Sequence, residues 1–144
     1  MPLFSKRSKK QSRQVEVTVF TGEVPLEVKG EASYQKALEL IAGPKTDSGH
    51  SHDCVGVLVR EPKNPYDQNA IAVHAEDGRG NAILVGYVNR ADAARLAPAI
   101  DRLNAAGTQV AMEATIIGGW DRGDGDEGHY GIWLRYDPTD FGLD

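Results

Sequence analysis

The stretch from residue 60 to residue 73, near the middle of the chain, places stricter demands on the backbone than any other. Pro62 and Pro65 each fix φ and lack a backbone N–H, so neither can continue a regular helix or an inner strand. Tyr66 is the one large side chain between them and the next apolar run. The residues whose side chains can bond nearby backbone groups and hold turns are Asn64, Asp67 and Asn69. The stretch is therefore predicted to be an ordered loop between two strands rather than a simple connection.

Runs of β-branched and aromatic residues, several with period-two alternation, predict short strands on both sides of this loop. The predicted strands cover residues 15–20, 26–28, 54–60, 70–74, 82–88, 109–117 and 130–136. Turn-forming residues at 76–81 separate two of them, which predicts an antiparallel meander in this part of the chain. The run at 82–88 is the most apolar and is expected at the centre of the sheet.

Two segments have the periodicity of an α-helix. Residues 31–41 place apolar side chains on one face, and Gly43-Pro44 ends that segment. Residues 89–106 begin at Asn89, whose amide suits an N-cap, and contain Pro98 in their interior. Because proline interrupts the hydrogen bonds of a helix, a kink or a split into two short helices is expected there.

Many short strands, two helical segments and glycine-rich turns favour a mainly β fold of the α+β class, with a small β-barrel or curled sheet and helices at its ends. A chain of 144 residues can bury a core of its own as one domain. We assign residues 15–137 to that domain, residues 1–14 to a disordered basic tail and residues 138–144 to a short polar tail. The basic tail either binds phosphates without specificity or is simply solvated.

The cysteine content and the apolar runs restrict the compartment. Cys54 is the one cysteine, so no internal disulfide can form, and a reducing compartment fits this composition. The basic start is not followed by the apolar core of a secretory signal, and no apolar run approaches the length of a membrane span. The chain is therefore expected to be cytoplasmic, without contact to a membrane.

The formal net charge of −5 conceals an uneven distribution. Residues 1–14 hold five of the 16 basic residues and none of the 21 acidic ones, which leaves residues 15–144 with 11 basic and 21 acidic residues, a net charge of −10. A nucleic-acid-binding domain normally carries the opposite charge. Such a body can bind a phosphate backbone only if its positive charges are concentrated at one site.

Two segments contain residue types that ligate metals. His50, His52 and Cys54 alternate along one extended segment and could share a face, which would permit a zinc site. The favoured interpretation is a polar loop at 45–53 that leads into a strand, because no second pair of ligands accompanies these three. The glycine-rich segment 118–128 has the acidic composition of a calcium loop but not the ligand order of an EF-hand, so a hairpin tip is favoured. No cofactor is expected.

The central stretch resembles the core motif of the HIRAN domain family. The matching pattern is Glu61-Pro62-x-Asn64-Pro65-Tyr66-Asp67-x-Asn69-Ala70-Ile71-x-Val73. Two weaker matches follow the family's order, with Val28 to Tyr34 upstream, and with Val85-Gly86-Tyr87-Val88, Arg90 and the alanine-rich run after it downstream. The resemblance extends over roughly residues 26–117.

This resemblance implies an OB-like or SH3-like barrel that binds single-stranded DNA, with a pocket for the 3′ end of the strand, in DNA repair or replication-fork processing. It implies that Asp67 accepts a hydrogen bond from the terminal 3′-hydroxyl. It also implies that Tyr66 and Tyr34 shape the pocket or stack on a base, and that Arg90 contacts a phosphate. Each has a structural alternative, since Asp67 can merely hold its turn, the tyrosines can pack in the core and Arg90 can be a surface residue.

Arg60 and Lys63 flank the same loop and could add positive charge to the site. The expected partner is therefore single-stranded DNA or a DNA end. The chain has no Gly-x-x-x-x-Gly-Lys-Ser/Thr loop for ATP-driven motion. It is therefore expected to be either a free-standing reader of DNA or an accessory to another protein, with a helicase or nuclease as the candidate partner.

A second hypothesis is a protein-interaction module that kept the fold and lost the DNA pocket. Ala32 and Ser33 stand where well-understood members of the family have a basic residue and an aromatic one, and the acidic body also favours this alternative. Its contact surface would be an exposed Trp120 or an open strand edge at 130–136. An enzyme is not expected, because the histidines and serines are scattered and form no set of nucleophile, base and orienting group.

Overall fold

The computed structural model describes residues 16–144, so the predicted basic tail at 1–14 lies outside the described residues. The strands are β1 (Glu16–Phe20), β2 (Val24–Lys29), β3 (His50–Arg60), β4 (Ile71–Glu76), β5 (Ala82–Val88), β6 (Thr108–Gly118) and β7 (Tyr130–Tyr136). The helices are α1 (Gln35–Ala42) and α2 (Arg90–Ala105), together with the 3-10 helices η1 (Glu31–Tyr34) and η2 (Pro138–Phe141). The predicted meander is confirmed in β3, β4 and β5, which pair antiparallel in sequence order.

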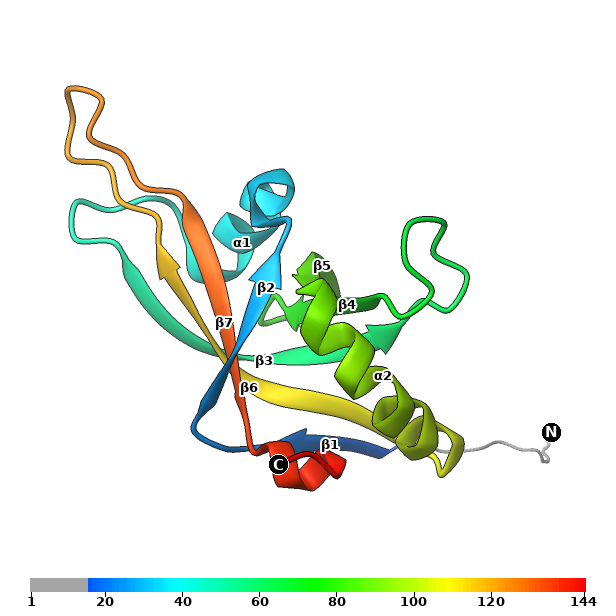
Figure 1. Cartoon of the computed structure of the whole chain (residues 1–144). Coiled ribbons are helices and arrows are strands. Elements are labelled where there is room, and N and C mark those ends of the chain that lie inside the picture. The colour runs from blue at the N-terminus through cyan, green and yellow to red at the C-terminus, as the bar shows by residue number, and fades with distance from the viewer. Residues whose placement is uncertain (1–15) are drawn as a thin grey trace, which may run out of the picture.

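Six of the seven strands close into a barrel (Figure 1). The order β6-β3-β4-β5-β2-β7 returns to β6, and every pairing around this ring is antiparallel. The remaining strand, β1, lies outside the ring and pairs parallel with the first half of β6. The predicted small β-barrel with two helical segments is confirmed.

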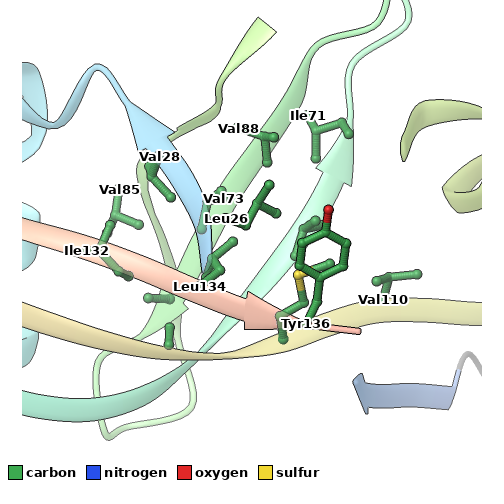
Figure 2. Packing of buried hydrophobic residues seen from close by; sticks show 14 of the residues in the cluster. Leu26, Val28, Ile71, Val73, Val85, Val88, Val110, Ile132, Leu134 and Tyr136 are labelled. Atoms are coloured by element: carbon green, nitrogen blue, oxygen red, sulfur yellow. The ribbon is translucent and has the colours of Figure 1, made fainter. Parts of the chain in front are cut away.

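The barrel interior holds the core, because alternate residues of each strand point inward. Figure 2 shows Leu26 of β2, Val73 of β4, and Leu134 and Tyr136 of β7 meeting there. All four side chains are buried. The predicted alternation in the sixth strand is confirmed in β6, whose buried inward residues are Val110, Met112, Ala114 and Ile116.

The helix at 90–105 is continuous through Pro98, so of the two alternatives expected there, a kink or a split, the split into two short helices is wrong. Asn89 caps it as predicted, since its side-chain oxygen accepts a hydrogen bond from the Asp92 backbone N–H at 3.1 Å. Pro98 itself lies on the exposed face, while the opposite face buries Leu96 and Ile100. Burial of that face holds the helix together across the missing hydrogen bond.

The first helical segment is a 3-10 turn followed by α1, with its apolar face on the core as predicted. Two polar side chains fasten it to β7. The Glu31 carboxylate accepts a hydrogen bond from the Ile132 backbone N–H, and Gln35 bonds both the N–H and the C=O of Tyr130, at 2.7 and 2.8 Å. Burial raises the pKa of Glu31 against the lowering effect of its backbone hydrogen bond. These bonds place Tyr34, the last residue of η1, at one end of the barrel.

Three expectations about boundaries and edges are corrected. The third strand begins at His50 and pairs with β6 from there, so the predicted polar loop at 45–53 ends earlier than expected. Strand β7 pairs with β2 on one side and β6 on the other, so the predicted open edge at 130–136 does not exist. Residues 138–141 form η2, and Phe141 is buried against Phe20 and Tyr136 rather than in a polar tail. None of the helices among residues 16–144 is both long and apolar enough to cross a membrane.

Candidate nucleic-acid interface

The loop between β3 and β4 is braced by its own side chains, as its turn-forming residues predicted. The Asn64 side-chain oxygen accepts hydrogen bonds from the backbone N–H groups of Tyr66 and Asp67 at 2.9 and 3.2 Å. Its amide nitrogen donates to the Glu61 carboxylate at 3.0 Å. Asp67 Oδ1 accepts from the Asn69 N–H at 2.9 Å. These bonds are those of Asx-type turns, which substitute side-chain acceptors for backbone ones.

Tyr66 projects from this braced loop into solvent, with 84% of its surface exposed. The Tyr66 ring therefore does not pack in the core, which was the structural alternative to a binding role for this residue. The Tyr66 backbone carbonyl accepts a hydrogen bond from Arg90 Nη2 at 3.0 Å, which ties the start of α2 to the loop. An aromatic ring presented on a fixed backbone is suited to stacking on a planar ligand.

Asp67 and Arg90 lie next to each other, and Arg90 also bonds the backbone of Tyr66. Arg90 Nε is 3.9 Å from Asp67 Oδ2, and the side chains are 77% and 18% exposed, respectively. An ion pair this exposed contributes little to stability. Within residues 16–144, Asp67 Oδ2 takes no hydrogen bond, so one oxygen holds the turn and the other remains available to a ligand. Both roles considered for Asp67 are thus compatible.

Two grooves meet along the ridge formed by residues 64–67 and Arg90. The first, here called the tyrosine groove, has a volume of about 530 Å³. Besides the ridge, it is lined by Lys29, Tyr34, Ala70, Tyr87 and Val88. Its walls come from β2, η1 and β5, which the closed barrel brings to the loop. The closure therefore assembles a mostly apolar groove with two tyrosine rings and cations at its margin.

The second groove, here called the amide groove, has a volume of about 600 Å³. Besides the ridge, it is lined by Pro62, Lys63, Gln68, Asn69 and Ala94. Its walls are thus the outer half of the loop and the first turns of α2. Amide and ammonium groups predominate here, in contrast to the rings of the tyrosine groove.

Five of the six predicted site residues line these grooves, and Arg60 does not. Its guanidinium is only 10% exposed and pairs with Asp101 at 2.9 Å. It also donates to the backbone carbonyls of Gln68 and Ala70 at 3.1 and 3.0 Å. The structure therefore gives Arg60 a bracing role between the loop and α2, outside the lining of both grooves.

Tyr87 and Lys29 are groove residues that sequence reasoning did not select. The Tyr87 hydroxyl donates to the Glu61 carboxylate at 3.1 Å, and burial followed by this bond raises the pKa of Tyr87. Tyr87 belonged to the motif that carried the family resemblance, which was a usable signal. Lys29 had no such signal, because only the pairing of Lys29 with Tyr87 across β2 and β5 brings it to the site.

The charge of the grooves is opposite to that of the body. Lys29, Lys63 and Arg90 are the basic residues in the two linings, and Asp67 is the one acidic residue among them. The body outside residues 1–14 carries a net charge of −10. Basic residues therefore outnumber acidic ones in the lining of the two grooves, with Lys29 also paired to Glu27 at 3.1 Å. A local excess of positive charge is the condition that an acidic nucleic-acid-binding body has to meet.

The residue types that could ligate a metal make other contacts. Among residues 16–144, no group of three His, Cys, Asp or Glu side chains is arranged to hold a metal ion. The His50 ring stacks on Tyr130, with centroids 5.6 Å apart, and its Nε2 lies 2.9 Å from the Pro44 carbonyl. Burial, with a smaller contribution from Asp53, raises the pKa of Cys54 to about 11, so its sulfur stays a neutral thiol.

Trp120 is only partly exposed, so it does not provide the surface that the protein-interaction hypothesis required. Its indole N–H donates to Asp126 at 3.2 Å, and the Arg122 guanidinium lies 5.0 Å from the centre of the ring. The favoured hairpin tip is confirmed, since residues 118–128 connect β6 and β7 and fold around this indole.

Comparisons with known proteins agree with this description. Residues 53–118, which run from β3 through the loop and α2 to the end of β6, match the family model of the HIRAN domain. The crystal structure of the HIRAN domain of human HLTF is similar to this chain, at 20% sequence identity over 79% of this chain and 77% of that chain, with a TM-score of 0.40. Comparison with curated proteins found no significant match. The predicted family resemblance is confirmed by the match over residues 53–118.

Proposed function

Because residues 53–118 carry the HIRAN domain pattern, we propose that this chain is a DNA-binding module that takes the 3′ end of a single strand into the tyrosine groove. HIRAN is a binding domain and not a catalytic one, so the function proposed here is recognition rather than chemistry. The observation that carries the proposal is the concentration of cations around an exposed tyrosine in an otherwise acidic body. Attraction of phosphate by this ridge is electrostatic, and stacking on Tyr66 adds a surface that every base can use.

Asp67 is assigned to the terminal hydroxyl. Its Oδ2 accepts a hydrogen bond from the 3′-hydroxyl, while Arg90, 3.9 Å away, stays close enough to contact the phosphate of the same nucleotide. A 3′-phosphate would instead place negative charge against the Asp67 carboxylate. Like charges at this distance repel, so the site favours a free end over a phosphorylated one.

Tyr34 and Tyr87 are assigned to the walls that hold the terminal base. The Tyr87 hydroxyl donates a hydrogen bond to the Glu61 carboxylate. The ring is therefore fixed and acts as an apolar surface. Tyr34 is fixed through η1 by the bonds of Glu31 and Gln35 to β7. Ala32 and Ser33 add no stacking surface, so discrimination between bases is expected to be weak.

The test measures fluorescence anisotropy of a short single strand, labelled at its 5′ end, with the full chain. We expect the free 3′-hydroxyl strand to bind about tenfold more tightly than its 3′-phosphate counterpart, a difference of about 1.4 kcal/mol. Asp67→Asn should abolish most of this preference, because the amide still holds the turn but no longer repels the phosphate. Asp53→Asn is the matched control, since Asp53 bonds Thr115 and lines neither groove.

Two outcomes count against the proposal. If neither strand binds at low salt, the chain does not recognise DNA, and the hypothesis of a protein-interaction module is favoured instead. If both strands bind equally in the wild-type protein and in Asp67→Asn, binding occurs without recognition of the end.

A further inference from the structure

The amide groove lies across the ridge from the tyrosine groove and has a different chemistry. It is not needed to hold a terminal nucleotide, because the assigned roles of Asp67, Arg90 and the tyrosines are met at the ridge and in the tyrosine groove. Yet the two grooves share residues 64–67 and Arg90, so a ligand that leaves one groove over the ridge enters the other. The amide groove is thus adjacent to the proposed end site along a continuous surface.

Free hydrogen-bond donors line the amide groove. Lys63 is exposed, and within residues 16–144 its ammonium forms no ion pair. In the same part of the chain, the side-chain amides of Gln68 and Asn69 form no hydrogen bonds with other residues, although both lie in a loop rich in such bonds. Three side chains with free N–H groups therefore face one groove.

Asp67 is the single acidic residue in this lining, and two basic residues, Lys63 and Arg90, accompany it. Asp67 Oδ1 accepts from Asn69 N, and Oδ2 lies beside Arg90. Lys63 and Arg90 therefore give the groove a positive balance, in a body whose net charge is −10. The groove has cations and amide donors, and Tyr66 is the one aromatic residue in its lining. Such a groove suits a phosphodiester backbone better than it suits stacked bases.

We propose that the amide groove is a second subsite, which binds the sugar-phosphate backbone of the strand whose terminal nucleotide lies in the tyrosine groove. The strand crosses the ridge at Tyr66, Arg90 contacts the phosphate at the crossing, and Lys63 contacts a phosphate further from the end. This proposal rests on the proposed function, because it requires a strand end in the tyrosine groove. The second subsite would extend the bound part of the strand beyond its terminal nucleotide. The affinity of the protein for a strand would therefore depend on the length of that strand.

The test compares a dinucleotide with an octanucleotide, both with a free 3′-hydroxyl, in titrations of the full chain by calorimetry at several salt concentrations. Lys63→Gln should weaken binding of the octanucleotide about threefold to tenfold and leave the dinucleotide unchanged. The slope of log affinity against log salt should fall by about 0.7 for the octanucleotide alone, the change for one lost contact to a single-strand phosphate. Lys36→Gln is the matched control, because Lys36 is an exposed residue of α1 that lines neither groove.

The outcomes separate this inference from the proposed function. If the wild-type chain binds the dinucleotide and the octanucleotide equally well, no second subsite exists. If Lys63→Gln weakens both ligands equally, or no more than Lys36→Gln does, Lys63 acts only through the general charge of the protein and the inference fails. Failure of both ligands to bind the wild-type chain, by contrast, overturns the proposed function itself. Unchanged thermal unfolding of the variants verifies that each remains folded.

Discussion

At the scale of single residues, side chains in the loop at 61–70 divide into those that build the site and those that face a ligand. Asn64 uses its oxygen and its nitrogen inside the loop, so its role is architectural. Asp67 uses one oxygen for the turn and keeps the other free. Tyr66 makes no side-chain hydrogen bond with residues 16–144 and is 84% exposed. The degree of internal bonding thus distinguishes a scaffold residue from a binding residue at neighbouring positions.

Tyr66→Ala is expected to separate binding from stability. Because the ring is exposed, its removal should change the free energy of unfolding by less than about 0.5 kcal/mol. It should weaken binding of a single strand by about 1–3 kcal/mol, the usual contribution of one stacked base. Urea unfolding and anisotropy on the same preparations measure the two quantities. A loss of stability as large as the loss of binding would indicate that Tyr66 supports the fold instead.

At the scale of elements, the loop is fastened to its neighbours by polar side chains, most of them partly buried. Arg60, the last residue of β3, reaches both the loop carbonyls and Asp101 of α2. Glu61 joins Asn64 of the loop to Tyr87 of β5. The loop, α2 and β5 are therefore positioned as one unit, which is what a ligand shared by all three requires.

Arg60→Ala is expected to destabilise the protein by about 2–4 kcal/mol, because it leaves Asp101 and two loop carbonyls without their buried donor. The free energy of unfolding in urea measures this loss. Arg79→Ala is the control, since Arg79 is an exposed residue of the β4–β5 turn and should change stability by less than about 0.5 kcal/mol. Equal, small effects of the two substitutions would show that Arg60 is not a brace, and a direct contact with DNA would then be its remaining role.

At the scale of the whole molecule, closure of the barrel is what completes the site. Strands β2 and β5 meet at only two residue pairs, Val28 with Val88 and Lys29 with Tyr87. This short contact brings Lys29 and the adjoining η1, with Tyr34, to the loop. Closure also brings Lys29 to the grooves that Lys63 and Arg90 line, although the charge of the molecule as a whole opposes binding of a polyanion.

Gly86→Ala tests the closure, because this glycine lies where β5 approaches β2. A Cβ at Gly86 would lie 2.5 Å from Val28 Cγ1 and 2.8 Å from the Lys29 carbonyl oxygen, so the strands would have to separate. We expect a loss of about 2–4 kcal/mol in the free energy of unfolding. Gly80→Ala is the control, because its φ of +87° is strained for alanine but no atom lies within 4 Å of the added carbon.

The control should cost only about 1–2 kcal/mol, the usual penalty of a left-handed backbone for alanine. Weaker binding of DNA by folded Gly86→Ala, with Gly80→Ala unaffected, would connect the closure to the site. Equal losses of stability in the two variants would contradict the argument that contact between β2 and β5 limits the closure.

Local patterns explain why much of the fold could be predicted. The cap at Asn89, the turn at 76–81 and the Asx turns of the central loop depend on residues only a few positions apart, so the sequence predicts them directly. The strand register in the meander follows from period-two alternation for the same reason. Boundaries at His50 and Pro138 were misjudged, because polar residues there become ordered only through pairing with β6 and packing of Phe141 on the core.

By itself, the sequence determined the strands and helices, the braced loop and its family, and the residues on that loop that line the grooves. Tertiary structure alone decided that β7 is enclosed rather than open, that Arg60 is a brace, and that Lys29 joins the site. The physical reason is the range of the interactions. Alternation, capping and turn formation act between neighbours in the chain, whereas barrel closure and the concentration of charge depend on residues far apart in sequence, whose proximity only the packed fold establishes.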